Sequence, residues 1–283
     1  KNGMFSNVAI NVDSIINDSA YLHIHLAPRP RISKINYNGV KKSEKDDLKE
    51  KLGLMVDNQL TPNMIDRAKI LAQRYFEDKG FKNAEIDILQ HDDPAAPDKV
   101  IVDINIEKNG KIIINKINVI GNTVIPEKKL KGTIFTKGVL KGIREKDGFH
   151  NWFRSHKFVE SKYKEAKDNL QAYYAELGYR DAIIVADTVK NIDEKHVDIN
   201  IHVEEGEKYY IRNIEWVGNS VYNTDALSYM LKMKKGDVYN QKLLNDRLAG
   251  DEYAVGNLYY NNGYVFYRLD PVETNIVGDS VDL

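Results

Sequence analysis

Cysteine is absent from the 283-residue sequence, which excludes disulfide bonds and metal sites built on thiolates. Long apolar runs are absent too, because no stretch approaches the ~18 apolar residues of a membrane-spanning helix. Positive and negative side chains nearly cancel, at a formal net charge of −1. No bulk field therefore favours nucleic acid or an anionic membrane, and the composition is that of a globular protein.

Signatures of catalysis are also missing. No Gly-x-Ser-x-Gly turn and no glycine-rich phosphate loop occurs. His23 and His25 share one face of an expected strand, but no third metal ligand is near. His150 and His156 lie in an expected loop with Glu160. A solvated surface is the favoured interpretation of both pairs, and a metal-binding protein or envelope hydrolase is the alternative. We expect a protein that is not an enzyme and that binds no cofactor.

One pattern is present three times. The copies are Ile32–Gly39, Ile114–Gly121 and Ile211–Gly218. In each copy, isoleucine stands seven and four residues before the glycine, and a large apolar residue stands two before it. The β-branched residues, separated by polar ones, predict a strand, and the glycine permits a turn.

A first helix is predicted after each glycine. An apolar pair spaced four residues apart follows at the same offset in every copy and is typical of a buried helix face. The pairs are Leu48/Leu52, Leu130/Ile134 and Leu227/Leu231. In the first copy we expect Ser43 to cap this helix, with Asp46 completing a weak capping box.

A second, longer helix follows. In the first repeat it is predicted to start at Thr61-Pro62, with threonine as N-cap and proline at the first helical position. A glycine followed by an aromatic residue predicts a Schellman ending. The three endings are Gly80-Phe81, Gly178-Tyr179 and Gly263-Tyr264. The third helix departs once from the pattern, with Asp251 in place of alanine.

Two further strands close each unit, so each repeat reads strand, helix, helix, strand, strand. The last strand is nearly identical in two repeats, at Val102–Ile106 and Val197–Ile201. Phe5–Ile10 parallels Phe81–Ile86, so the first thirty residues resemble the end of such a unit. The predicted domains are 1–30, the C-terminal hairpin of a truncated unit; 31–109; 110–207, with an insertion at about 136–160; and 208–283, whose last strand is truncated.

Short junctions join the predicted units. They are Lys108–Lys111 and Glu204–Lys208, and each contains a glycine among charged residues. Links of this kind permit rotation while they keep neighbouring units in contact. We therefore expect a jointed, extended array in place of a single globule.

The repeating unit resembles the POTRA domain. The resemblance rests on the opening Ile-x-x-Ile-x-aromatic-x-Gly-Asn and on the helix end Tyr-Tyr-x-x-x-Gly-Tyr, and it covers the whole chain. Its clearest examples are Gly121-Asn122, Gly218-Asn219, Tyr174–Ala182 and Leu258–Tyr264. The first repeat departs at Val40, where the pattern has asparagine. The run Phe149–Phe158 is similar to the version found in Bacteroidetes.

The resemblance implies an α+β fold of tandem POTRA domains, each with two helices packed on a three-stranded mixed sheet. Arrays of this family lie at the periplasmic face of the outer membrane. They receive unfolded outer-membrane proteins, dock accessory lipoproteins and periplasmic chaperones, and feed a C-terminal membrane barrel, which we expect beyond Leu283. No nucleic acid is expected. The alternative is a relative in two-partner secretion or in translocation and assembly.

The insertion in the second repeat is a predicted partner-contact loop. Exposed tryptophan, phenylalanine and arginine together are typical of a binding hot spot. The predicted contact residues are Phe149, Trp152, Phe153, Arg154, Lys157 and Phe158. The alternatives are that the aromatic residues pack on their own domain, or that the loop lies on a membrane surface.

The fourth element of the second repeat is the predicted binding strand for substrate. In a POTRA-like sheet this element is expected at an edge, where an extended segment can pair with it. Glu85 and Asp87 place charge on the first repeat's edge, and Pro271 blunts the third. The predicted binding residues are Ala182, Ile183, Ile184, Val185 and Ala186. Alternatively, a neighbouring repeat or the insertion covers Ile183 and Val185.

Overall fold

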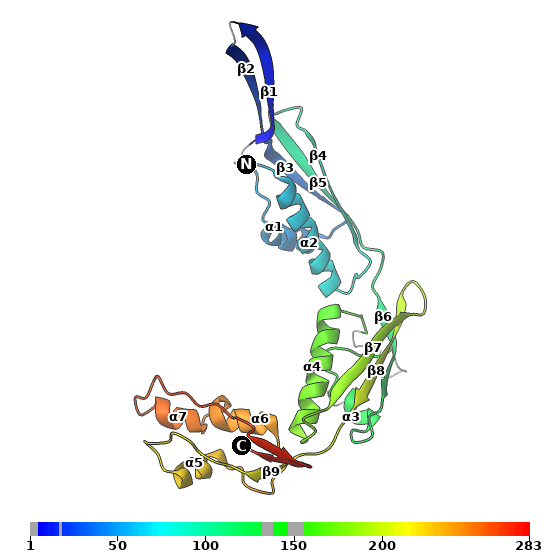
Figure 1. Cartoon of the computed structure of the whole chain (residues 1–283). Coiled ribbons are helices and arrows are strands. Elements are labelled where there is room, and N and C mark those ends of the chain that lie inside the picture. Colours follow the sequence, from blue (N-terminus) through cyan, green and yellow to red (C-terminus); the bar gives the residue numbers. More distant parts are fainter. Residues whose placement is uncertain (1–4, 17–18, 132–137, 147–155) are drawn as a thin grey trace. The chain divides into compact units, whose positions relative to one another are not determined.

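The computed structural model describes residues 5–16, 19–131, 138–146 and 156–283. The chain divides into two compact units, Lys1–Lys111 and Ile112–Leu283, and each is described by itself (Figure 1). Every repeat has its own hydrophobic core.

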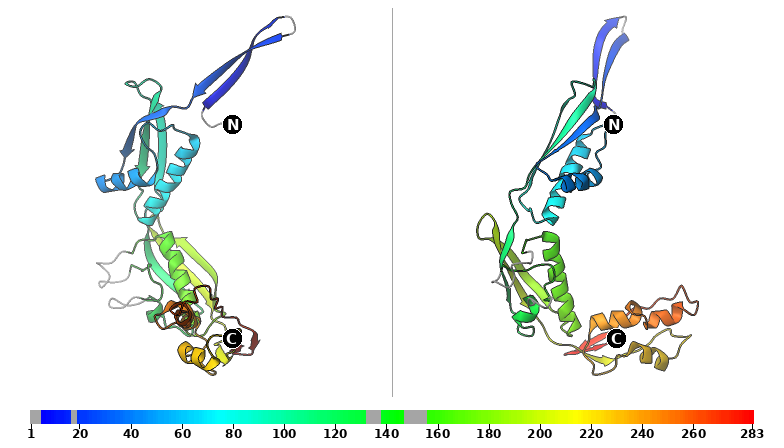
Figure 2. Two further views of the ribbon diagram at one scale, coloured as in Figure 1. Left: turned by 90° about the vertical axis from the view of Figure 1, so that its left-hand side faces the viewer. Right: turned by 180° about the vertical axis from the view of Figure 1, so that it is seen from behind.

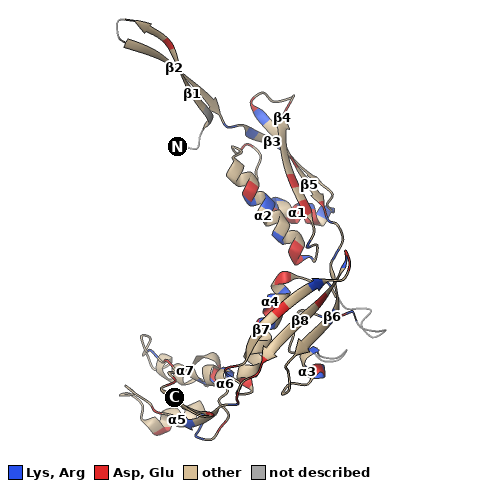
Figure 3. Ribbon diagram, turned by 45° about the vertical axis from the view of Figure 1, so that its right-hand side comes forward, with Lys and Arg blue, Asp and Glu red and all other residues tan. Residues whose placement is uncertain are grey.

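The chain begins with a β-hairpin. β1 (Phe5–Ile16) and β2 (Ser19–Pro28) pair antiparallel. Cross-strand partners include Val8 with Leu26 and Ile10 with Ile24, and these four side chains are exposed. Figure 3 shows the hairpin almost free of charged residues. Its membership of a truncated POTRA domain remains a prediction.

The first full repeat forms a three-stranded mixed sheet in the order β3-β5-β4. β3 (Arg31–Asn38) pairs parallel with β5 (Lys99–Glu107), and β5 pairs antiparallel with β4 (Glu85–Asp92). The two helices are α1 (Lys42–Lys51) and α2 (Pro62–Asp78). Both lie on the same face of the sheet (Figure 2). Alternate residues of β5 are buried beneath them: Val100, Val102, Ile104 and Ile106.

The start and end of α2 agree with the sequence signals. The Thr61 hydroxyl accepts a hydrogen bond from the Met64 amide at 3.2 Å, and Pro62 is the first helical residue. At the other end, the amide of Phe81 donates to the carbonyl of Phe76 and that of Gly80 to Glu77. Those two bonds define the predicted Schellman motif. The same pair of bonds ends the helices before Gly178 and Gly263.

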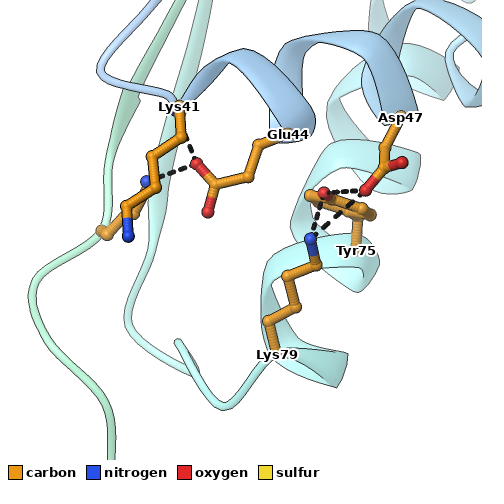
Figure 4. A network of polar contacts seen from close by, with 6 residues as sticks. Lys41, Glu44, Asp47, Tyr75 and Lys79 are labelled. Carbon is orange, nitrogen blue, oxygen red and sulfur yellow. Dashed lines mark hydrogen bonds and ion pairs between the residues drawn. The ribbon is translucent and has the colours of Figure 1, made fainter.

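The predicted cap of α1 is wrong. The helix begins one residue before Ser43, and Lys41 is its N-cap. The Glu44 carboxylate accepts the Lys41 amide at 2.8 Å, so glutamate at the third helical position supplies the bond expected of Asp46 (Figure 4). Burial tends to raise the pKa of Glu44, but hydrogen bonds from Lys108 and Lys41 outweigh it and lower that pKa overall.

A polar cluster ties the two helices of the first repeat together. The Asp47 carboxylate accepts the Tyr75 hydroxyl at 2.6 Å and the Lys79 ammonium at 3.3 Å (Figure 4). These hydrogen bonds lower the pKa of Asp47, with the Tyr75 hydroxyl the largest cause. The cluster joins α1 to α2, so its role is structural.

The second full repeat has the same topology. Its sheet order is β6-β8-β7. β6 (Ile113–Ile120) pairs parallel with β8 (His196–Glu204), which pairs antiparallel with β7 (Ile183–Asn191). α3 (Glu127–Lys131) carries the buried Leu130, and α4 (Glu160–Glu176) lies along the sheet (Figures 1 and 2). The predicted core residue Ile134 lies outside the described residues.

The third full repeat has a shorter sheet, in the order β10-β11-β9. β9 (Tyr210–Asn213) pairs parallel with β11 (Ser280–Asp282), which pairs antiparallel with β10 (Asn275–Val277). Its first helix is α5 (Thr224–Leu231). By analogy with the strands that follow Gly80 and Gly178, the fourth element of this repeat is expected at about 266–269, but residues 267–274 form no regular element and the edge strand is β10. Pro271 interrupts the run, because proline supplies no backbone N–H to a strand ladder.

The second helix of the third repeat is broken into three pieces. They are α6 (Gln241–Asn245), a π-helical turn η2 (Asp246–Gly250) and α7 (Val255–Tyr260). The break falls at Asp251, the one residue that departs from the helix pattern, where the backbone is extended. Among all the described helices, none is both long enough and apolar enough to cross a bilayer.

Candidate functional site

The candidate binding strand, β7, lies at the edge of its sheet, where one side of its backbone faces away from β8. Ala182 is buried and Ile184 half-buried, so both face the core. Ile183 and Val185 are exposed over 49% and 47% of their surface. Inward and outward side chains therefore alternate over 182–185, and the two outward side chains are exposed.

A β-bulge divides β7. Ile184 pairs with Val203 and Ala186 with His202, so Val185 is the extra residue. A bulge bends an edge strand and discourages continuous pairing. An added strand could therefore pair only with two short stretches of β7, one on each side of Val185. This limits the length of continuous backbone pairing at the site. The sequence pattern did not show it.

Helix α4 holds the middle of β7 in place. The Asp187 carboxylate accepts the Tyr163 hydroxyl and the Lys167 ammonium, both at 2.8 Å. The hydrogen bond from Lys167 is the largest cause of the lowered pKa of Asp187. Burial, followed by the hydrogen bond to Asp187, raises the pKa of Tyr163. These contacts hold β7 on the face of the sheet that α4 covers. They leave the backbone edge of β7 that points away from β8 unpaired in the sheet.

Part of the predicted contact loop falls outside the described residues, namely Phe149, Trp152, Phe153 and Arg154. Lys157 is half-buried and bridges to Ile113. Phe158 is only 1% exposed and lies 5.8 Å from the Tyr163 ring.

Phe158 is therefore a core residue, and assigning it to a partner surface was wrong. It stands just before the N-cap Val159, and Tyr163 is the fourth helical residue. An apolar pair at those two positions is a hydrophobic staple. The sequence contained this signal, which sequence reasoning missed.

The histidine pairs form no metal centre in the part of the chain that the structure describes. No group of three histidine, aspartate or glutamate side chains comes close enough there to hold a metal ion. His23 and His25 lie on the exposed hairpin, and His150 is outside the described residues.

A second polar constellation joins the second repeat to the third, and sequence reasoning did not predict it. The Arg180 guanidinium lies 2.5 Å from Glu273 and 5.4 Å from the centre of the Tyr209 ring. The Tyr239 hydroxyl donates to Glu273 at 2.7 Å. Burial, followed by that hydrogen bond, raises the pKa of Tyr239 to about 12. The Tyr209 hydroxyl donates to Asp181, also at 2.7 Å. We call these five residues the joint cluster.

The backbone is closely packed at the same joint. The Tyr209 amide donates to the Gly178 carbonyl at 2.9 Å. Gly178 has φ +94°, and a β-carbon placed there would lie 2.5 Å from a methyl group of Val238. No larger residue fits without displacement, so the helix-ending glycine also serves as a contact point between repeats.

Glu205, within the predicted linker Glu204–Lys208, is buried and fixes the linker to the second repeat. Its carboxylate accepts the Tyr174 hydroxyl at 2.7 Å and the amides of Thr123 and Val124 at 2.9 and 3.0 Å. Hydrogen bonding outweighs burial and lowers its pKa. The linker therefore leaves the domain from a fixed position.

The repeated β-α-α-β-β unit, with its mixed three-stranded sheet, places the chain in the class of tandem α+β repeat proteins. The chain belongs to the POTRA family, described as a surface antigen variable number repeat, whose sequence model matches residues 30–109, 112–206 and 209–283. The predicted family and α+β fold are thus confirmed.

Two curated relatives are assembly factors. The chain is 23% identical over 274 residues to a putative outer membrane protein assembly factor of Treponema pallidum, across 93% of this chain and 30% of the relative. It is 26% identical over 239 residues to the outer membrane protein assembly factor BamA of Neisseria meningitidis, across 82% of this chain and 29% of the relative. The chain therefore spans about 30% of the length of these relatives.

Two solved structures are among those to which the chain is similar. Haemophilus influenzae BamA POTRA3-5 is 19% identical, with a TM-score of 0.47 over 89% of this chain and 94% of that one. The N-terminal domain of Omp85 from Thermosynechococcus elongatus is 13% identical, with a TM-score of 0.41 over 90% and 95%.

Proposed function

We propose that this chain is a periplasmic scaffold of outer-membrane β-barrel assembly and that it binds unfolded outer-membrane proteins as extended strands along β7. The observation that supports this most directly is the accessible outer side of β7, with Ile183 and Val185 exposed beside it. The names of the two curated relatives support the setting, at the periplasmic face of the outer membrane.

Backbone pairing suits this task because it is largely independent of the client's sequence. An added strand gains main-chain hydrogen bonds, and alternate side chains supply apolar contact. Barrel strands alternate apolar and polar residues. One face of such a strand would contact Ile183 and Val185, and Ala186 is small enough to leave room beside them.

The remaining partners follow from the same role. Accessory lipoproteins and periplasmic chaperones would contact the predicted loop through Phe149, Trp152, Phe153 and Arg154. A membrane barrel at the C-terminal side would receive the clients. The work is non-covalent, without enzymatic chemistry or cofactor.

A relative in two-partner secretion or in translocation and assembly is the alternative. The number of repeats in the full-length protein separates the two interpretations, because those relatives carry fewer or differently spaced copies. An envelope hydrolase or a metal-binding protein is the distant alternative, and zinc titration of the chain, with an activity screen, tests it.

An NMR titration with a peptide copied from a barrel strand tests the proposal. We expect amide shifts over 182–189 and expect Ile183→Lys with Val185→Glu to weaken binding while the fold is retained. Leu89→Lys on β4 is the matched control, because Leu89 is an exposed apolar residue of the equivalent edge strand. Shifts that avoid 182–189 would refute the proposal.

A further inference from the structure

The face of the second sheet that points away from its core carries a row of hydrogen-bonded polar side chains. Ile201 of β8 is buried in the core, so its neighbours in sequence, Asn200 and His202, lie on the opposite face. The Asn200 side chain accepts the Asn118 amide at 2.7 Å and donates to the Thr188 hydroxyl at 3.3 Å. This row therefore links all three strands through polar contacts.

The next row toward the linker is apolar on both sides of a histidine. His202 pairs with Ile120 of β6 and with Ala186 of β7. Ile120 is 47% exposed, and the bulge adds the exposed Val185 beside Ala186. The row thus presents an imidazole between aliphatic side chains, and its smallest member, an alanine, stands on the edge strand.

The same row of the first repeat is polar throughout. Its three positions, defined by the same cross-strand pairings, hold Asn38, Asn105 and Asp87. The Asn38 side-chain amide donates to that of Asn105 at 2.8 Å, so the polar contacts continue into this row. Asp87 is exposed and stands where the second repeat has Ala186. The apolar row is therefore a property of the second repeat, and the repeated fold does not require it.

We propose that Val185, Ala186 and His202 form a subsite, the Ala186 subsite, which selects client strands with an aromatic residue opposite Ala186. The inference rests on the proposed function, because the client is the strand that pairs with β7. Neighbouring strands lie about 4.8 Å apart, so the client backbone would run roughly 10 Å from that of β8. A phenylalanine or tyrosine ring that leans across the small Ala186 side chain spans this distance and meets the imidazole. A leucine side chain is shorter and ends above Ala186.

The physical gain comes from covering exposed apolar surface with a ring. Aromatic side chains pair favourably across strands with β-branched residues such as Val185 and with other aromatic rings. The strands of outer-membrane barrels carry their aromatic residues in two girdles, near the membrane interfaces. The Ala186 subsite would therefore hold a client strand near one of its ends, and not at its middle.

A pair of peptides tests the subsite. Both have about ten residues of alternating valine and threonine, with lysine at each end for solubility, and they differ in one central residue, phenylalanine or leucine. Each is titrated into the 283-residue chain while NMR follows the β7 amides, the Ala186 methyl group and the His202 ring protons. We expect the phenylalanine peptide to bind about three- to tenfold more tightly. Its ring current should also move the Ala186 and His202 signals upfield, which leucine cannot do.

Two valine substitutions on the same face of β7 give a matched pair. Ala186→Val fills the subsite with a residue that suits an exposed strand, and the two peptides should then bind within about twofold of each other. Thr188→Val introduces the same residue one row away, and the preference for phenylalanine should remain. His202→Asn places the first repeat's residue in this row and should reduce the preference without removing peptide binding.

The outcomes separate the subsite from the proposed function. Equal binding of the two peptides, with amide shifts over 182–189, would overturn the subsite and leave strand binding by β7 intact. Shifts that avoid 182–189 would overturn both. A preference for phenylalanine that survives Ala186→Val, or that appears without upfield shifts at His202, would also overturn the subsite, because the ring would then lie elsewhere.

Discussion

Removing the Arg180 side chain should loosen the third repeat. The side chains of Arg180 and Glu273 are 21% and 24% exposed, so the burial of this ion pair is intermediate between that of a surface pair and that of a fully buried pair. A charge-assisted hydrogen bond contributes about 1.5–3 kcal/mol, and a cation over an exposed ring about 0.5–1 kcal/mol. Allowing for partial exposure, we expect Arg180→Ala to cost about 2 kcal/mol.

The assay follows Trp216 during urea unfolding in the Trp152→Phe background. Trp216 reports the third repeat, because its indole N–H donates to Ser228 at 3.0 Å. Lys242→Ala is the matched control: Lys242 reaches across the same joint to Glu176 at 3.5 Å, but it is 61% exposed. That pair should contribute no more than about 0.5 kcal/mol.

A double-mutant cycle isolates the contact itself. Arg180→Ala, Glu273→Gln and the double variant should show a coupling of about 1 kcal/mol. Coupling near zero, or an Arg180→Ala effect no larger than that of Lys242→Ala, would show that the joint cluster does not hold the repeats together.

Three further predictions follow. Small-angle scattering should give a radius of gyration well above the ~19 Å of a compact chain of this length, and a compact value would contradict the jointed array. Trp152→Ala with Phe153→Ala should leave the melting temperature within a few degrees, whereas Phe158→Ala should cost about 3–5 kcal/mol by thermal or urea unfolding; equal losses would place the loop aromatics in the core. The pKa of Asp187 is lower in the folded protein than in the unfolded chain, so ionised Asp187 stabilises the fold at pH values above the ordinary aspartate pKa. That stabilisation is lost as the pH falls through the folded-state pKa. Asp187→Asn should therefore reduce the loss of unfolding free energy on acidification, and an unchanged loss would show that the pairing with Lys167 contributes nothing.

The fold was largely predictable because local signals recur at fixed offsets. Thr61 and Pro62 fix the start of α2, and Gly80 with Phe81 fixes its end through two backbone bonds. Signals of this kind depend on neighbouring residues only. The exception at α1 is also local: the helix starts two residues earlier than predicted, so Glu44 accepts the Lys41 amide in place of the predicted pairing of Asp46 with Ser43.

The parts of the candidate site that were missed depend on distant residues. Arg180 and Glu273 are far apart in sequence and meet only when two repeats pack together. The bulge at Val185 is visible only in the register against β8, because side-chain alternation looks continuous in the sequence. Asp251 was noticed as a departure, yet nothing local showed that the helix would break there.

The most direct test of strand binding by β7 is site-specific photo-cross-linking. A photoreactive residue replaces Ile183 in one variant and the similarly exposed Leu89 on β4 in another, and a urea-denatured outer-membrane protein is diluted onto each. The account predicts strong cross-links at Ile183 and weak ones at Leu89, where charged neighbours disfavour pairing. Equal yields at both positions, or cross-links at Leu89 alone, would contradict it.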